Sequence, residues 1–166
     1  RLYMPNNTQI IKDGAVVDDS YEVVAKDAET VPSSAALLPL QLWLATREEL
    51  TGRSDIGVWL DSDESPKALE GNFDGLALIA INFPAFADGR GFTYGRELRE
   101  QHGWKGEMRA IGNFMRDQLF SLQRLGFNSF ALQGVDLQDA LNSLDDFSTN
   151  YQPDVLEKRP LFRRRA

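Results

Sequence analysis

Strand-like and helix-like segments alternate four times between residues 56 and 144, and this alternation constrains the fold more than any other feature. The strand-like runs are residues 56–60, 76–83, 107–111 and 128–132. Such alternation predicts a parallel sheet flanked by helices, because parallel neighbours need crossover connections. Residues 76–81 are all apolar, which is typical of a strand covered on both faces. We therefore expect an α/β fold with a central parallel sheet.

Capping signals predict where the helices begin and end. We expect helices from Pro39 to Leu50 before Gly52, from Ser65 to Glu70, from Thr93 to Gly103, from Asn113 to Gly126, and after Asp136. Serine, threonine, asparagine and aspartate favour helix N-termini, proline favours the first turn, and glycine favours the position after the last turn.

The N-terminal part reads as a β-hairpin that precedes the alternating region. Ile10-Ile11 and Val16-Val17 flank a turn containing Asp13-Gly14, a strong hairpin signal. Residues 18–34 are mixed and polar, and we expect connecting structure there. We predict one domain over residues 1–151, with the hairpin region at about 1–34, and a C-terminal tail over residues 152–166.

The charge balance argues against several classes of partner. The 166 residues include 25 acidic and 18 basic side chains, a net charge of −7. An acidic chain is repelled by nucleic-acid phosphates and by anionic membranes, and the longest apolar run is too short to span a bilayer. No signal peptide is visible. We expect a cytoplasmic protein with no nucleic-acid or membrane partner.

The chain has no cysteine and a single histidine, His102. This composition excludes disulfides, thiol nucleophiles, cysteine-ligated iron–sulfur clusters and the usual zinc sites, while a carboxylate-only Mg²⁺ site stays open. We interpret His102 as a helix-end residue rather than a catalytic base. No catalytic residue, metal site or cofactor is evident.

Loops at the carboxyl ends of the predicted strands are where ligands bind in open parallel sheets. Two of these loops, residues 83–92 and Gly112-Asn113, lead into predicted helix N-termini, which attract anions. The candidate anion-binding residues are Asp88, Gly89, Arg90, Gly91, Asn113 and Arg116. Arginine suits oxyanions such as sulfite, sulfate or phosphate. The same Asp-Gly-Arg-Gly segment is also good turn chemistry.

The tail places two large apolar residues beside three cations. Its candidate partner-binding residues are Leu161, Phe162, Arg163, Arg164 and Arg165. Aromatic and arginine side chains contribute most to binding hot spots. Two alternatives stay open: a solvated end, or a tail that packs back on its own domain with its arginines near Asp145 or Asp146.

Several short motifs resemble one bacterial family. They are Phe83-Pro84, Asp88-Gly89-Arg90-Gly91-Phe92, Leu98-Arg99, residues 107–112, Arg116-Asp117-Gln118 and Leu161-Phe162-Arg163-Arg164. In order and spacing they resemble domain-of-unknown-function family 934, over roughly residues 37–165. The resemblance implies the description "oxidoreductase probably involved in sulfite reduction" and a gene neighbourhood with the sulfite reductase haemoprotein. It implies no catalytic residues.

Three functions remain open at this point. The first is an accessory protein of assimilatory sulfite reduction, which docks on the sulfite reductase haemoprotein or its electron donor. The second is an enzyme or sensor that binds a sulfur oxyanion or sulfonucleotide at the Arg90 loop. The third is a noncovalent flavin or NADPH oxidoreductase, although the chain lacks the usual dinucleotide signature.

Overall fold

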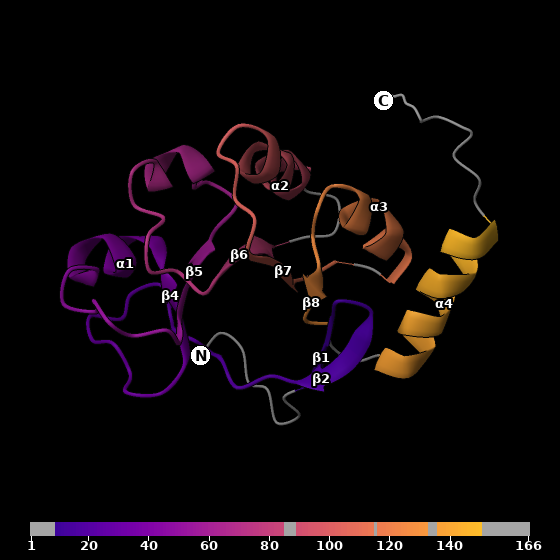
Figure 1. The fold of residues 1–166 in the computed structure, drawn as a ribbon, viewed down its shortest axis with the longest axis horizontal. Coiled ribbons are helices and arrows are strands. Elements are labelled where there is room, and N and C mark those ends of the chain that lie inside the picture. The colour runs from indigo at the N-terminus through magenta and orange to yellow at the C-terminus, as the bar shows by residue number, and fades with distance from the viewer. Residues whose placement is uncertain (1–8, 85–88, 115, 133–135, 151–166) are drawn as a thin grey trace.

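Eight strands form one sheet in the order β2-β1-β8-β7-β6-β5-β4-β3 (Figure 1). The structure is a computed structural model that describes residues 9–84, 89–114, 116–132 and 136–150, with side chains in the last helix as far as Leu144. The strands are β1 (Gln9–Lys12), β2 (Ala15–Asp18), β3 (Glu22–Val23), β4 (Ala36–Pro39), β5 (Ile56–Leu60), β6 (Leu78–Phe83), β7 (Glu107–Gly112) and β8 (Ser129–Phe130). Strands β3 to β8 run parallel. The predicted parallel α/β sheet is therefore confirmed.

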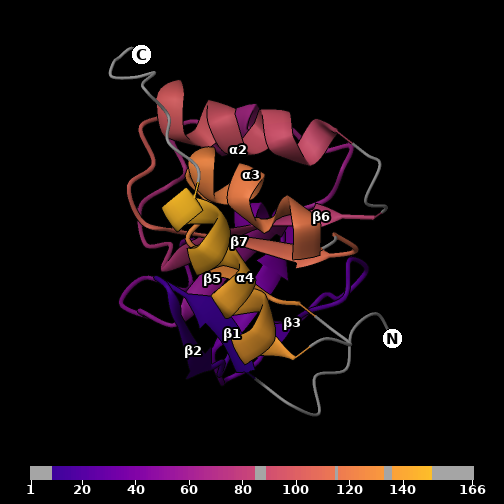
Figure 2. The same ribbon diagram turned by 90° about the vertical axis from the view of Figure 1, so that its right-hand side faces the viewer.

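The helices of the crossovers lie on one face of this sheet. They are α1 (Leu40–Thr46), η1 (Pro66–Leu69), α2 (Arg90–Glu100), η2 (Arg116–Gln118) and α3 (Leu119–Arg124), and α4 (Leu137–Asn150) follows β8. Strands β4 to β8 are neighbours in chain order, so successive right-handed crossovers place their helices on the same face. Figure 1 shows α1, α2 and α3 on that face, and Figure 2 shows α4 beside the hairpin.

The sheet curls strongly, because its two edge strands are joined by a very short link. Only residues 19–21 separate the end of β2 from the start of β3, and such a link spans at most about 15 Å. Eight strands in a flat sheet would place the edges about 34 Å apart. The edges can meet this constraint only if the sheet bends round toward a barrel, with the helices outside.

Two apolar clusters fill the two faces of the curled sheet. Outside, Val58, Ile79 and Ala110 pack under the helices, all fully buried. Inside, Trp59 and Ala80 pack with the neighbouring strands and with side chains of residues 17–23. The indole N–H of Trp59 donates to the Val24 carbonyl at 2.9 Å, which ties the end of β3 to the inner face.

Several local predictions are confirmed. Asp13 and Gly14 both have positive φ, 52° and 81°, as a two-residue type I′ hairpin requires. Asp136 caps α4, since its Oδ1 accepts from the backbone N–H groups of Gln138 and Asp139 at 2.9 and 3.2 Å. Ser65 caps η1, with Pro66 in its first turn. The hairpin also extends the main sheet, because β1 pairs with β8.

Other local predictions are wrong. The short strand β3 lies within residues 18–34, where we expect connecting structure, and β4 includes Pro39, the expected start of a helix. Thr93 lies inside α2, which begins three residues earlier at Arg90 after Gly89. Asn113 caps no helix, since α3 begins only at Leu119 and the turn before it is the short η2. Helix α1 ends at Thr46, so Gly52 closes the turns that follow it.

Candidate functional site

Three polar side chains meet at the carboxyl edge of the sheet. Lys26 Nζ lies 2.9 Å from Asp61 Oδ2, and Asn82 Nδ2 donates to Asp61 Oδ1 at 3.1 Å. The backbone N–H of Ser62 donates to the same Oδ1 at 2.8 Å. Lys26 follows β3, Asp61 follows β5 directly, and Asn82 lies near the end of β6. Three parallel strands therefore bring this carboxyl-edge cluster together.

Asp61 is the centre of the cluster and carries a negative charge at neutral pH. Partial burial acts to raise the pKa of Asp61, but the hydrogen bonds from Lys26, Asn82 and Ser62 outweigh it and hold the pKa below its ordinary value. The same contact with Asp61 raises the pKa of Lys26. The arrangement makes Asp61 a hydrogen-bond acceptor rather than a proton donor.

Arg90 begins α2 and turns toward the loop after β5. Its guanidinium donates to Ser62 Oγ at 3.3 Å, and the Tyr94 hydroxyl, one turn along α2, donates to the Ser62 carbonyl at 2.8 Å. Gly91 lets α2 pack closely against β6, because a Cβ there would lie 2.6 Å from a ring atom of Phe83. The predicted Arg90 loop is therefore tied to the carboxyl-edge cluster through Ser62.

The remaining predicted anion-binding residues point elsewhere. Asn113 lies at the same sheet edge, but its Nδ2 donates to the Pro84 carbonyl at 2.9 Å. Arg116 forms an ion pair with Asp139 of α4. Gly89 contributes backbone at the start of α2. Asp88 and the tail residues Leu161, Phe162, Arg163, Arg164 and Arg165 lie outside the described residues.

The surroundings of Arg90 are acidic. Asp61, Asp63 and Glu64 flank Ser62 on one loop, and Lys26 also lies 3.5 Å from Asp63. Three carboxylates near one arginine and one lysine give this edge an excess of negative charge, which opposes the binding of an anion. The electrostatics of this edge therefore favour a cationic contact over a free oxyanion.

Arg109 forms a second cluster that the sequence analysis missed. It lies in the middle of β7, and its side chain is only 4% exposed. Its guanidinium donates to Asp19 at 3.0 Å, to Glu107 at 2.8 Å and to Ser129 Oγ at 3.0 Å. The Tyr21 ring centroid lies 5.6 Å from its central carbon. The Arg109 cluster thus joins the link between the sheet edges to the middle of the sheet.

Each charge of the Arg109 cluster has a partner. Burial acts to raise the pKa of Glu107, but the charge and hydrogen bonds of Arg109, with those of Ser129 and Lys12, lower it overall. Lys12 Nζ lies 3.2 Å from Glu107 Oε1. A cavity of about 540 Å³ opens beside the cluster, lined by the hairpin, the link and β7. The charged side chains of the cluster that line this cavity are paired with one another and connect the hairpin, the link and β7.

A signal for both clusters was present in the sequence. Glu107 and Arg109 are two residues apart in a strand whose intervening residue, Met108, is apolar, so both charges had to share one face. Asp61 directly follows a predicted strand, in the same way as the two candidate loops at residues 83–92 and 112–113. The hydrogen bonds of Lys26 and Asp19 had no such signal, because these residues lie far away in sequence.

The single histidine lies away from the carboxyl edge. His102 follows the C-terminal end of α2, and its backbone N–H donates to the Glu97 carbonyl at 3.1 Å. Its ring centroid lies 5.7 Å from that of Phe73. Because α2 returns antiparallel to the strands, His102 lies at the amino-terminal edge. Its position agrees with the interpretation of a helix-end residue.

The fold and the clusters define a singly wound α/β domain with a curled sheet and an ion-paired carboxyl edge. The chain belongs to a family of bacterial proteins of unknown function, domain-of-unknown-function family 934, whose sequence pattern matches residues 57–162. The match begins inside β5, about twenty residues later than the resemblance suggested. It includes both Arg90 and Arg109.

No curated protein matches the sequence. Within the described part of the chain, no helix is long and apolar enough to cross a membrane. The described side chains also include no group of three histidine, aspartate or glutamate residues placed to hold a metal ion.

Proposed function

We propose that this chain is a non-catalytic partner in bacterial sulfite reduction, which binds the sulfite reductase haemoprotein or its electron donor. The family resemblance, with the gene neighbourhood that it implies, supports the pathway. The observation that supports a binding role is the state of the carboxyl edge, where Asp61 and Lys26 are paired with each other. An acceptor held ionised by its neighbours is suited to positioning and recognition rather than to proton transfer.

The tail is the segment that we propose contacts the partner. It carries five basic and two acidic residues, so the tail has a net charge of +3 and residues 1–151 a net charge of −10. Leu161 and Phe162 supply apolar anchors, and Arg163, Arg164 and Arg165 supply cations that steer association with an acidic surface.

Binding of the full chain to purified sulfite reductase haemoprotein, followed by isothermal titration calorimetry, tests the proposal. We expect a saturable complex. Leu161→Ala with Phe162→Ala should weaken it by about tenfold or more, the effect of losing a hot-spot anchor. The matched variant Arg163→Gln, Arg164→Gln and Arg165→Gln keeps the anchors and should mainly slow association. Absence of binding to both the haemoprotein and its electron donor, or sulfite reduction by the chain alone, would overturn the proposal.

A sulfur oxyanion or sulfonucleotide site at Arg90 is a second candidate. It is favoured by the position of Arg90 at the start of α2, next to the Ser62 hydroxyl, and opposed by the carboxylates of the loop that carries Ser62. Calorimetric titration with sulfite and sulfate tests it, with Arg90→Ala as the variant and the exposed Arg96→Ala, on the same helix, as the control. Equal titrations of the three proteins would remove this candidate.

The third candidate, a noncovalent flavin or NADPH oxidoreductase, has a simple test. Purified full-length protein should then show flavin absorbance or a change in NADPH fluorescence on mixing. A colourless protein that leaves NADPH fluorescence unchanged would remove this candidate.

A further inference from the structure

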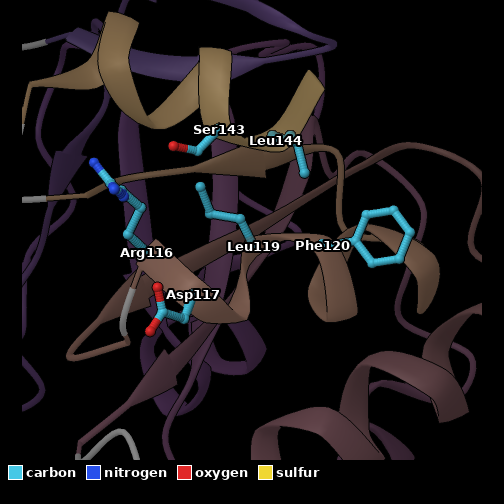
Figure 3. Close-up of a pocket in the computed structure, with 6 residues that line it drawn as sticks. All are labelled: Arg116, Asp117, Leu119, Phe120, Ser143 and Leu144. Atoms are coloured by element: carbon cyan, nitrogen blue, oxygen red, sulfur yellow. The ribbon is translucent and has the colours of Figure 1, made fainter. Parts of the chain in front are cut away.

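A groove between α3 and α4 is separate from both charged clusters. Its volume is about 290 Å³, and it is lined by Arg116, Asp117, Leu119, Phe120, Ser143 and Leu144. Figure 3 shows Ser143 and Leu144 of α4 facing Leu119, with Arg116 and Asp117 at one end and Phe120 at the other. We call this the α3–α4 groove.

The groove has an apolar floor and a polar end. Leu119 and Leu144 are nearly fully buried and form the floor, while Phe120 is half-buried at its side. Asp117 and the ion pair of Arg116 with Asp139 are exposed at the polar end. The volume lies at the small limit of pockets that hold drug-sized ligands, about 300–1,000 Å³. It suits one or two large side chains rather than a nucleotide.

We propose that Leu161 and Phe162 of the chain's own C-terminal segment seat in the α3–α4 groove. Helix α4 ends at Asn150, and eleven residues lead from there to Leu161. Such a segment spans up to about 36 Å, whereas α4 itself is about 21 Å long. The tail therefore reaches every point along the groove.

Charge favours this occupant. Three arginines follow Phe162 directly in a tail of net charge +3, and the rest of the chain has a net charge of −10. Asp117 and Asp139 are exposed beside the groove. When the two apolar side chains sit on the floor of the groove, the arginines lie near these carboxylates. Because the tail is part of the same chain, its effective concentration at the groove exceeds that of a free peptide.

The seating concerns the free chain and does not depend on the proposed function. Its consequence does rest on that function: a seated tail is withheld from the reductase until the partner displaces it. Affinity for a partner is then reduced by the fraction of tails that are seated.

Engineered disulfides in the full chain test the seating without any partner present. The chain has no cysteine, so Ser143→Cys with Arg163→Cys makes a single pair and keeps both apolar anchors. The control pair is Ser54→Cys with Arg163→Cys, because Ser54 is exposed just before β5, which is three strands away from β8 in the sheet. Under dilute mild oxidation we expect the groove pair to close as a monomer at least about tenfold faster than the control pair.

A second comparison ties the rate to the anchors. Adding Leu161→Ala and Phe162→Ala to the groove pair should remove its advantage, while the same changes in the control pair should leave its rate unchanged. Equal rates for the two pairs would overturn the proposal, as would an advantage that survives loss of both anchors. A disulfide-linked dimer as the main product would assign the groove to a second copy and also overturn it.

Discussion

The Arg109 cluster lies in the middle of the curled sheet and the carboxyl-edge cluster lies at the ends of its strands. The two clusters differ most in burial. In the Arg109 cluster the side chains of Arg109, Asp19 and Glu107 are 4%, 5% and 11% exposed. At the carboxyl edge, Lys26 is 48% exposed and Asp61 is 23% exposed. The residue types are alike, but water solvates the carboxyl-edge cluster and is largely excluded from the Arg109 cluster.

This difference in burial separates charges that hold the fold together from charges that can bind a partner. Breaking a buried ion pair strands a charge in the protein interior, which costs several kcal/mol, whereas an exposed pair contributes little. We infer that the Arg109 cluster holds the two edges of the sheet together. The carboxyl edge can change partners at small cost, so it is the surface where binding residues can vary without loss of the fold.

The largest expected effect comes from Arg109→Met. The variant keeps much of the side-chain volume but leaves the buried Asp19 without its cation and Glu107 with only the partly exposed Lys12. We expect the free energy of unfolding to fall by about 3–5 kcal/mol, measured by urea denaturation at pH 7. Adding Asp19→Leu and Glu107→Leu should recover most of that loss, since no buried charge then remains unpaired. A loss below about 1 kcal/mol for Arg109→Met would contradict the assignment.

Gly112→Ala should have an intermediate effect at the carboxyl edge. Gly112 has φ +92°, and a Cβ there would lie 2.6 Å from the Phe83 carbonyl oxygen. We expect a loss of about 2–3 kcal/mol, from backbone strain and the displaced strand end. Gly52→Ala is the matched control, because Gly52 has φ +96° with open space around it, and it should cost about 1 kcal/mol. Equal losses would show that the close approach to β6 contributes nothing.

Acid should weaken the Arg109 cluster through Glu107. The pKa of Glu107 is lowered in the folded protein from its ordinary 4.5, so its stabilisation is complete above about pH 4.5. It is lost as the pH falls from there through the folded-state pKa. We expect Glu107→Gln to be less stable than the wild type at pH 7 and to lose less stability between pH 5 and pH 3, followed by chemical denaturation. An unchanged acid dependence in this variant would contradict the pairing.

The smallest expected effect comes from Lys26→Ala. Its pair with Asp61 is half exposed and screened by salt, so the loss should stay below about 1 kcal/mol and shrink further in 1 M NaCl. Thermal unfolding at low and high salt measures it. A loss as large as that of Arg109→Met would remove the distinction between the two clusters.

The sequence predicted the parts of the fold that follow local rules. The apolar runs, the Asp13-Gly14 turn and the Asp136 cap needed no knowledge of distant residues. The strand β3 escaped prediction because its two residues carry no strand pattern, and β4 escaped because its four residues lead directly into α1. The spacing of Glu107 and Arg109 indicates a shared face, but their contact with the link between the edges could not be predicted, because Asp19 is 90 residues away from Arg109. Prediction placed Arg90 and Asn113 at one edge but could not show that they bond to different neighbours.

Hydrogen–deuterium exchange tests most directly whether the Arg109 cluster joins the two edges of the sheet. The full-length wild type, Arg109→Met and Lys26→Ala would be compared at pH 7 under conditions where all three remain folded. We predict that Arg109→Met speeds exchange selectively in residues 16–24, which include both edges and their link, while Lys26→Ala leaves residues 16–21 unchanged. Unaltered protection of residues 16–24 in Arg109→Met would contradict the account.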